Sequence, residues 1–111
     1  PAALRRAYNY TRQTVAYQHR GAKLNIGKAS LTYQEQRLDL SKNDLRILQV
    51  LLENQGSVVS RNTLMERLWE TNSFIDENTL TVSVARLRKK LDAIGLTDFI
   101  STKKGLGYVI L

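Results

Sequence analysis

An apolar stripe along residues 77–93 limits the possible folds of this chain more than any other feature. At about 100° per residue in an α-helix, one narrow face collects five apolar side chains: Leu80, Val84, Leu87, Leu91 and Ile94. The opposite side carries Thr79, Val82 and Arg86, with Asn78 and Lys89 beside them. The pattern predicts a long helix that follows an N-cap at Asp76 and buries its stripe in a core. An outward valine is unusual for a face that meets only water.

Two shorter helices are predicted before this one. Ser41 is a favourable N-cap for residues 41–55, and Asp44 three positions later forms a weaker version of the capping box. The apolar stripe of this segment is formed by Leu45, Leu48 and Leu52. Ser60 is the predicted cap of residues 61–70. The apolar side of this second helix is formed by Leu64, Met65, Leu68 and Trp69, which we expect to lie in the core.

Short strands are predicted on both sides of the helices. Apolar and polar residues alternate in residues 23–40, which predicts an antiparallel meander with one packed face and one wet face. Residues 58–59 are predicted to form a very short strand. Residues 99–111 are predicted as a hairpin, with the turn Lys103-Lys104-Gly105-Leu106-Gly107. Residues 1–22 have no clear period and are interpreted as a helical remnant followed by a linker.

The order of these elements predicts an α+β fold of the winged helix-turn-helix class, with an N-terminal antiparallel β-meander, a three-helix core and a C-terminal β-hairpin. The 111 residues fit one domain. No apolar run approaches the roughly 20 residues of a membrane span, so neither a span nor a signal peptide is predicted. The chain has no Cys and one His, which argues against thiol chemistry, a His-based metal site and a catalytic triad. We expect no enzyme, no metal and no cofactor.

The formal net charge of +7 is unevenly distributed along the chain. Residues 1–34 carry +6, residues 35–85 carry −3 and residues 86–111 carry +4. Two basic segments around an acidic middle point to a polyanionic partner, such as nucleic acid or an anionic lipid surface. For any single Lys or Arg, a solvated basic surface is the simpler interpretation.

The outward side of the long helix has side chains that suit the major groove of DNA. Arg86 can bind guanine O6 and N7 together, while Thr79 and Val82 can contact a thymine methyl group. The hairpin turn adds Lys103 and Lys104, which suit phosphates or a minor groove. Each feature alone has an ordinary explanation, either a solvated basic helix face or an edge hairpin that lysine protects from aggregation. Together, in this order, they favour a DNA-binding winged helix.

Three stretches of the sequence resemble one known family. They are Val58-Val59-Ser60-Arg61 with Leu64 and Trp69, residues 79–91 with their RLRKKL run, and residues 100–108 with their GLGY end. Over about residues 23–111, the chain resembles the output domain of OmpR/PhoB-type two-component response regulators. Residues 74–91 look most like the branch that confers resistance to antimicrobial peptides such as bacitracin and lantibiotics. The resemblance makes residues 1–22 the end of a receiver domain and an interdomain linker.

The resemblance implies a role for each matching position. The helix of residues 77–93 becomes the recognition helix. Base contacts are implied for Thr79, Val82, Ser83 and Arg86. Phosphate contacts are implied for Trp69, Asn78, Arg88, Lys89, Thr102 and Tyr108. Lys103 and Lys104 of the hairpin are implied to enter the minor groove. A loop that faces RNA polymerase is implied for Glu70, Thr71, Asn72 and Ser73.

The resemblance also implies the partners. They are double-stranded DNA with tandem direct repeats, RNA polymerase, the receiver domain of the full-length chain, and a cognate histidine kinase acting on that receiver in a phosphorelay. Such a regulator is cytoplasmic and has no membrane partner. The chain departs from the family at Asn78, where many members have Arg, and at Ser83 and Ala85, where His or Arg is common. A protein-interaction module that binds an acidic partner through the basic surfaces is the alternative function.

Overall fold

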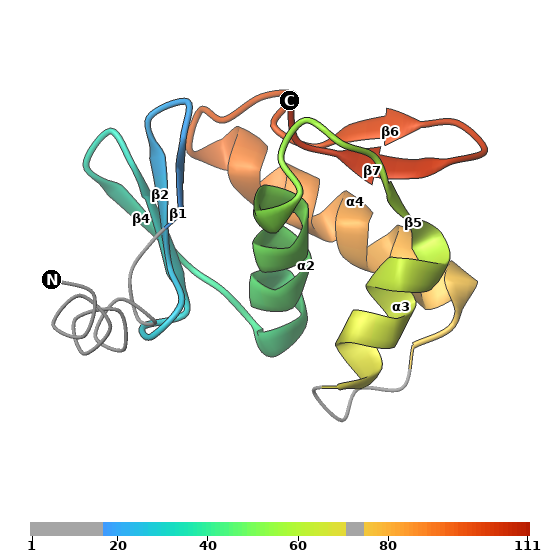
Figure 1. Ribbon diagram of the computed structural model, residues 1–111. Helices are drawn as coiled ribbons and strands as arrows, with labels where there is room; N and C mark the ends of the chain where they lie inside the picture. The colour runs from blue at the N-terminus through green and yellow to red at the C-terminus, as the bar shows by residue number, and fades with distance from the viewer. Residues whose placement is uncertain (1–16, 71–74) are drawn as a thin grey trace, which may run out of the picture.

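The computed structural model describes residues 17–70 and 75–111. Its elements follow in this order (Figure 1): β1 (Tyr17–His19), β2 (Ala22–Asn25), β3 (Ser30–Tyr33), β4 (Gln36–Asp39), α2 (Lys42–Glu53), β5 (Val59–Ser60), α3 (Arg61–Trp69), α4 (Glu77–Ala93), β6 (Ser101–Lys103) and β7 (Gly107–Val109). The predicted α+β winged helix-turn-helix arrangement is confirmed, with its meander, three helices and closing hairpin. None of the helices in these two ranges is both long and apolar enough to cross a membrane.

The first sheet begins before residue 23, where the predicted meander starts. Its order is β1-β2-β3-β4 with antiparallel neighbours, and one row across it consists of Tyr17, Leu24, Leu31 and Leu38. Residues 17–22 therefore belong to the sheet and not to the expected linker. The reason is the turn at Arg20 and Gly21, whose φ angles of 53° and 84° match the twist of a tight hairpin. The rest of the expected remnant and linker, residues 1–16, lies outside the described residues.

Capping side chains determine where the helices begin. The Ser41 hydroxyl accepts a hydrogen bond from the Asp44 amide at 3.1 Å, and the Asp44 carboxylate accepts one from the Ser41 amide at 3.3 Å. These reciprocal bonds form the capping box of α2. Asp44 is buried, and Lys90 of α4 donates to its carboxylate at 2.6 Å. Ser60 caps α3 and Asp76 caps α4, so all three predicted N-caps are confirmed.

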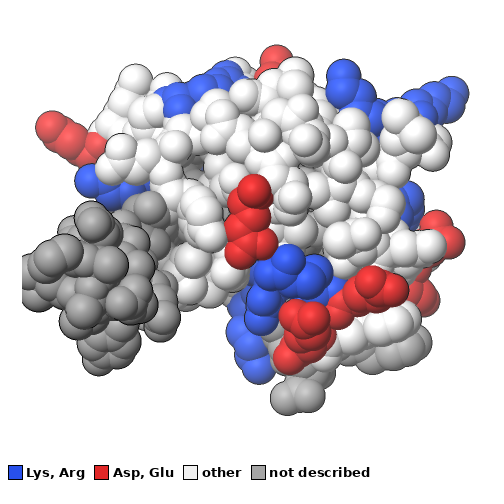
Figure 2. Space-filling model, in the orientation of Figure 1, with Lys and Arg blue, Asp and Glu red and all other residues white. Residues whose placement is uncertain are grey.

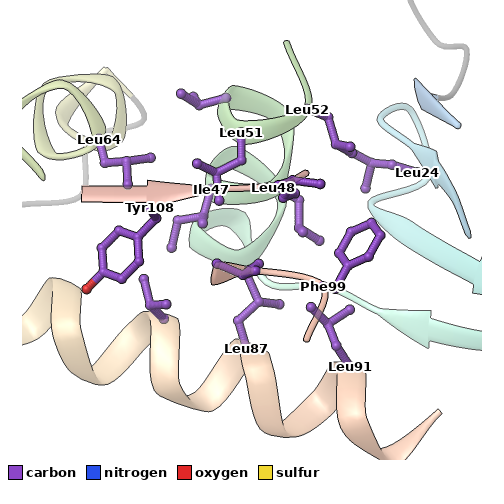
Figure 3. Close-up of a cluster of buried hydrophobic side chains, with 14 of the residues drawn as sticks. Leu24, Ile47, Leu48, Leu51, Leu52, Leu64, Leu87, Leu91, Phe99 and Tyr108 are labelled. Atoms are coloured by element: carbon purple, nitrogen blue, oxygen red, sulfur yellow. The ribbon is translucent and has the colours of Figure 1, made fainter. Parts of the chain in front are cut away.

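The core forms where α4 meets α2 and the first sheet. All five residues of the predicted α4 stripe are buried, and Leu80 and Leu87 have no exposed surface. Figure 3 shows side chains from several elements meeting in this cluster, among them Leu24, Ile47, Leu48, Leu51, Leu87, Leu91 and Phe99. Burial of the stripe fixes the rotation of α4 about its own axis, and therefore fixes which residues face outward.

The second sheet joins the closing hairpin to the helices in the order β5-β7-β6. Its strands differ from the prediction of strands at 99–102 and 108–111, because Phe99 and Ile100 are buried in the core rather than paired in a strand. Gly107 lies opposite Ser60 where β7 approaches β5. Its φ is 152°, and a Cβ atom at this position would lie 2.0 Å from the Val59 carbonyl oxygen. Only glycine allows the two strands to approach this closely.

We expect Gly107→Ala to destabilise the domain by about 2–5 kcal/mol, because the methyl group strains the backbone and separates β5 from β7. Gly105→Ala is the matched control: it also has a positive φ, of 76°, but a Cβ there would meet no atom within 4 Å. The control should lose only about 1–2 kcal/mol, the cost of a left-handed residue. Urea denaturation measures both changes. Equal denaturation midpoints for the two variants would contradict the requirement for glycine at position 107.

Candidate nucleic-acid interface

The outward side of α4 presents the predicted base-contacting side chains to the surroundings. Thr79 and Arg86 are exposed, Val82 is 42% exposed, and Ser83 is half-buried. Among the described residues, Arg86 has no ion-pair partner, so its guanidinium group is available to an external acceptor. The remaining large apolar residues of α4 are buried, which leaves Val82 as an apolar group on a polar surface. Such a side chain suits an apolar group of a partner.

The β6–β7 hairpin presents cations next to this helix. Lys103 and Lys104 are both exposed, and the Leu106 amide closes the turn by donating to the Lys103 carbonyl at 2.8 Å. Figure 2 shows basic side chains at the end of the hairpin, at the upper right of the view. Asn78 and Lys89 are also exposed, beside the outward side of α4.

Three of the predicted phosphate-binding residues contact one another. Arg88 donates from Nη2 to the Thr102 hydroxyl, and its guanidinium carbon lies 5.8 Å from the centre of the Tyr108 ring. Tyr108 is only 4% exposed, and its hydroxyl accepts a hydrogen bond from Arg61 Nη1 at 2.7 Å. That hydroxyl donates to no acceptor in the described part of the chain. This cluster, Arg88, Thr102 and Tyr108, attaches the hairpin to α4.

Trp69 differs from its expected place in the core. The ring is 48% exposed at the last position of α3, whereas Leu64, Met65 and Leu68 are buried as predicted. The indole nitrogen of Trp69, for which the family resemblance implies a phosphate contact, donates to the Ile75 carbonyl at 3.2 Å. The Ile75 carbonyl is the backbone acceptor that holds the indole at this position.

The surface of α2 and α3 carries paired charges. Glu53 lies 3.2 Å from Arg67, and Glu70 lies 3.5 Å from Arg67 and 3.9 Å from Arg46. Figure 2 shows acidic and basic side chains next to one another below the centre of the view, over the region of α2 and α3 in Figure 1. Glu70 is the first residue of the predicted polymerase-facing loop, and its other members, Thr71, Asn72 and Ser73, lie outside the described residues. No group of three acidic or His side chains in the described ranges could hold a metal ion.

Arg61 is a prominent residue of this region that reasoning from the sequence assigned no role. Its side chain donates hydrogen bonds to the Glu77 carbonyl at 2.7 Å, to the Thr81 hydroxyl at 2.8 Å and to the Tyr108 hydroxyl at 2.7 Å. A signal for it existed in the sequence. Arg61 directly follows the N-cap Ser60, and a cation at a helix N-terminus opposes the helix dipole unless other groups compensate it.

A family model described as "Transcriptional regulatory protein, C terminal" matches residues 35–110. The chain belongs to this family. The matched segment includes the three helices and the β6–β7 hairpin, and therefore every exposed side chain described above.

Relatives specify the branch of the family. The sensory transduction protein BceR of Halalkalibacterium halodurans is 43% identical over 109 residues, which cover 97% of this chain and 47% of that protein. The response regulator protein GraR of Staphylococcus aureus is 40% identical over 111 residues, which cover 97% of this chain and 49% of that protein. Among solved structures, the C-terminal domain of the nisin resistance regulator NsrR, a lantibiotic response regulator, matches with 41% sequence identity and a TM-score of 0.76. The match covers 85% of this chain and 94% of that domain.

The chain thus spans about half the length of the curated relatives it matches. The matches confirm the resemblance to output domains of OmpR/PhoB-type response regulators and to the antimicrobial-peptide resistance branch.

The N-cap of α4 gives the interface a pH-dependent element. The Asp76 carboxylate accepts a hydrogen bond from the Thr79 amide at 2.8 Å, and the backbone and side-chain hydrogen bonds with Thr79 hold the pKa of Asp76 below its ordinary value of 3.8. The ionised carboxylate therefore stabilises the fold above that ordinary value, and its contribution is lost as the pH falls through the lowered pKa.

We expect Asp76→Ala to lower the urea denaturation midpoint at neutral pH, with a difference from the wild type that shrinks below about pH 3.8. Asp76→Asn keeps a cap acceptor without its titration, so it should lie closer to the wild type at neutral pH. Denaturation curves measured from pH 2 to pH 7 check both statements. A difference between Asp76→Ala and the wild type that stays constant over that range would exclude the lowered pKa as its cause.

Proposed function

We propose that this domain is the DNA-binding output unit of a longer response regulator and that it controls transcription by binding duplex DNA in a sequence-specific manner. In this function α4 is the recognition helix in the major groove, and the β6–β7 hairpin is the wing in the minor groove. One observation carries the proposal: the outward side of α4, on which Arg86 has no ion-pair partner among the described residues, lies next to a hairpin with two exposed lysines. Arg88 connects the two elements.

The outward side of α4 supplies the base contacts. Arg86 donates two hydrogen bonds to guanine O6 and N7, and Thr79 and Val82 contact thymine methyl groups. Ser83 is short and half-buried, so it contributes at most one hydrogen bond at the edge of this surface.

Phosphate contacts surround the base-reading surface. Lys89 and Asn78 are exposed beside it, and the cluster of Arg88, Thr102 and Tyr108 borders it where the hairpin begins. Trp69 contributes its half-exposed ring to this border. The charged contacts release counterions and provide the part of the affinity that depends on salt but not on sequence. Lys103 and Lys104 continue that positive surface into the minor groove.

The remaining partners follow from family membership. We expect two domains to bind tandem direct repeats about one helical turn apart, which places both recognition helices on one face of the duplex. A receiver domain elsewhere in the full-length chain and its cognate histidine kinase regulate this binding in the cytoplasm. The loop that starts at Glu70 contacts RNA polymerase. The domain itself catalyses no reaction.

Selection of bound sequences from a random duplex pool tests the proposal directly. A recurring motif in two copies of the same orientation is the expected result. For the recovered site, log Kd should rise linearly with the logarithm of the salt concentration, with a slope of about 0.9 per neutralised phosphate. Equal affinity for every duplex would contradict sequence-specific binding and favour the alternative module for an acidic protein partner.

We expect Arg86→Ala to reduce affinity for the selected site by about 1–3 kcal/mol and to relax the preference at one base pair, because a bidentate contact to guanine is lost. Arg37→Ala is the matched control: Arg37 is exposed on β4, where it pairs with Asp39 at 3.1 Å, so its loss should leave the preference unchanged. Binding is measured by anisotropy against the site and its single-base variants. Uniform weakening on all sequences would identify Arg86 as a phosphate contact instead.

We expect Lys104→Ala to weaken binding and to reduce the salt slope by about 0.9, the value for one phosphate. Lys28→Ala removes the same charge from the exposed β2–β3 turn and should leave the slope unchanged. Affinities between 50 mM and 300 mM salt give the slope for each variant. A slope for Lys104→Ala equal to that of the wild type would exclude contact between the wing and the DNA backbone.

A further inference from the structure

Arg61 connects three elements that have to act together on DNA. It is the first residue of α3, yet its guanidinium group contacts α4 and β7. Its Nη2 atom donates to the Glu77 carbonyl at 2.7 Å and to the Thr81 hydroxyl at 2.8 Å, both in the first turns of α4. Its Nη1 atom donates to the Tyr108 hydroxyl at 2.7 Å, in the central strand of the wing sheet. One side chain therefore joins the recognition helix to the wing.

The geometry of these contacts is specific to arginine. The planar guanidinium group has five donors in a fixed fork. Nε of Arg61 faces Glu77 Oε1 at 3.4 Å, and the guanidinium carbon lies 5.8 Å from the centre of the Tyr108 ring. The Thr81 hydroxyl also donates to the Glu77 carbonyl at 3.1 Å, which closes a small hydrogen-bonded ring with Nη2. A lysine ammonium has three donors at a single point and cannot reproduce this arrangement.

The position of the contacts relates them to recognition. Glu77 and Thr81 flank Thr79 along the helix, and Val82 directly follows Thr81. Later in α4, Arg88 donates to Thr102 of the wing, and its guanidinium carbon lies 5.8 Å from the centre of the Tyr108 ring. The two arginines therefore hold the first and later turns of α4 against the same tyrosine. Figure 3 shows the Tyr108 hydroxyl pointing toward the α4 ribbon.

We infer that Arg61 is a positioning residue for sequence recognition: through Glu77, Thr81 and Tyr108 it fixes the first turns of α4 relative to the wing, so that both grooves are contacted in one register. The inference rests on the proposed DNA-binding function. Arg61 does not touch a base in this arrangement. Its loss changes the discrimination between sequences and leaves the sequence-independent attraction to phosphates in place.

The test compares Arg61→Met with Arg67→Met in the full domain. Arg67 lies on the same helix with nearly the same side-chain exposure, 28% against 30%, but it pairs with Glu53 and Glu70 instead. We expect Arg61→Met to lose about tenfold in affinity for the selected site, the range for hydrogen bonds to a charged group, with no change for an unrelated duplex or in the salt slope. Arg67→Met should leave all three quantities unchanged.

Two outcomes of this comparison would overturn the inference. Equal losses on both duplexes with a slope reduced by about 0.9 would make Arg61 a phosphate contact. An unchanged ratio of the two affinities would leave it without a role in recognition. Circular dichroism and urea denaturation show whether Arg61→Met is folded. Arg61→Lys is the second variant, because it keeps the charge but not the forked set of donors. It should lose discrimination as Arg61→Met does.

A double-mutant cycle with Thr81→Val identifies the route of the effect. This substitution removes one acceptor of Arg61 and keeps the shape of the side chain. If Arg61 acts through this bond, the losses in discrimination of Arg61→Met and Thr81→Val should not add. Fully additive losses would contradict that route.

A measurement without DNA separates failure of this inference from failure of the proposed function. Residual dipolar couplings of the free domain report the orientation of the first turns of α4 relative to β7. Arg61→Met should change this orientation, and Arg67→Met should not. An unchanged orientation would overturn the positioning role whether or not the wild-type domain prefers any DNA sequence. Absence of preference in the wild type would overturn the proposed function alone.

Discussion

Burial of one side of α4 is the constraint on which the rest of the structure depends. Leu80, Val84, Leu87 and Leu91 are each at most 1% exposed, and burying one such side chain contributes about 1.5–3 kcal/mol. Rotating the helix by even one residue would move this stripe by 100° and expose it. The same energy therefore determines which residues face outward. The side chains available to a partner are a direct consequence of hydrophobic packing on the opposite side of the helix.

Packing of α4 does not by itself position the wing. The β6–β7 hairpin meets the remainder of the fold through the buried residues of β7, through the close approach at Gly107 and through polar contacts of Tyr108 with two arginines. Partly exposed polar contacts of this kind contribute little net stability, but their directional geometry selects one arrangement among several of similar energy. The hydrophobic core thus accounts for most of the stability of the domain, and the arginine–tyrosine contacts add directional links between its two outward-facing elements.

The extent to which the sequence predicts this structure depends on how local each interaction is. The caps Ser41, Ser60 and Asp76 act within four residues, and the α4 stripe follows from the period of one helix, so both could be predicted. The strand β1 could not, because three residues give too short a pattern and its pairing depends on the turn at residues 20–21.

The exposed position of Trp69 and the contacts of Arg61 could not be predicted for a related reason. Their partners Ile75 and Tyr108 are 6 and 47 residues away, and no periodicity of a single element reveals them. The motif spacing did place the outward residues of α4 and the turn lysines on the correct elements. Their contacts with DNA remain a prediction, because a spacing specifies a position in the fold and not the ligand that reaches it.

The distribution of paired and unpaired charges favours DNA over an acidic protein partner. Arg46 and Arg67 on the α2–α3 surface are neutralised by Glu53 and Glu70, so this part of the surface offers alternating charge to any partner. In the described part of the chain, Arg86, Lys89, Lys103 and Lys104 have no acidic partner. All four lie on α4 or on the wing, whereas the other exposed lysines without an acidic partner in this part of the chain, Lys23, Lys28 and Lys42, lie on the first sheet and at the start of α2. An acidic protein patch could satisfy such cations in many arrangements. Cations on both a protruding helix and a protruding hairpin match a ligand whose charge is periodic and which has two grooves to accept them.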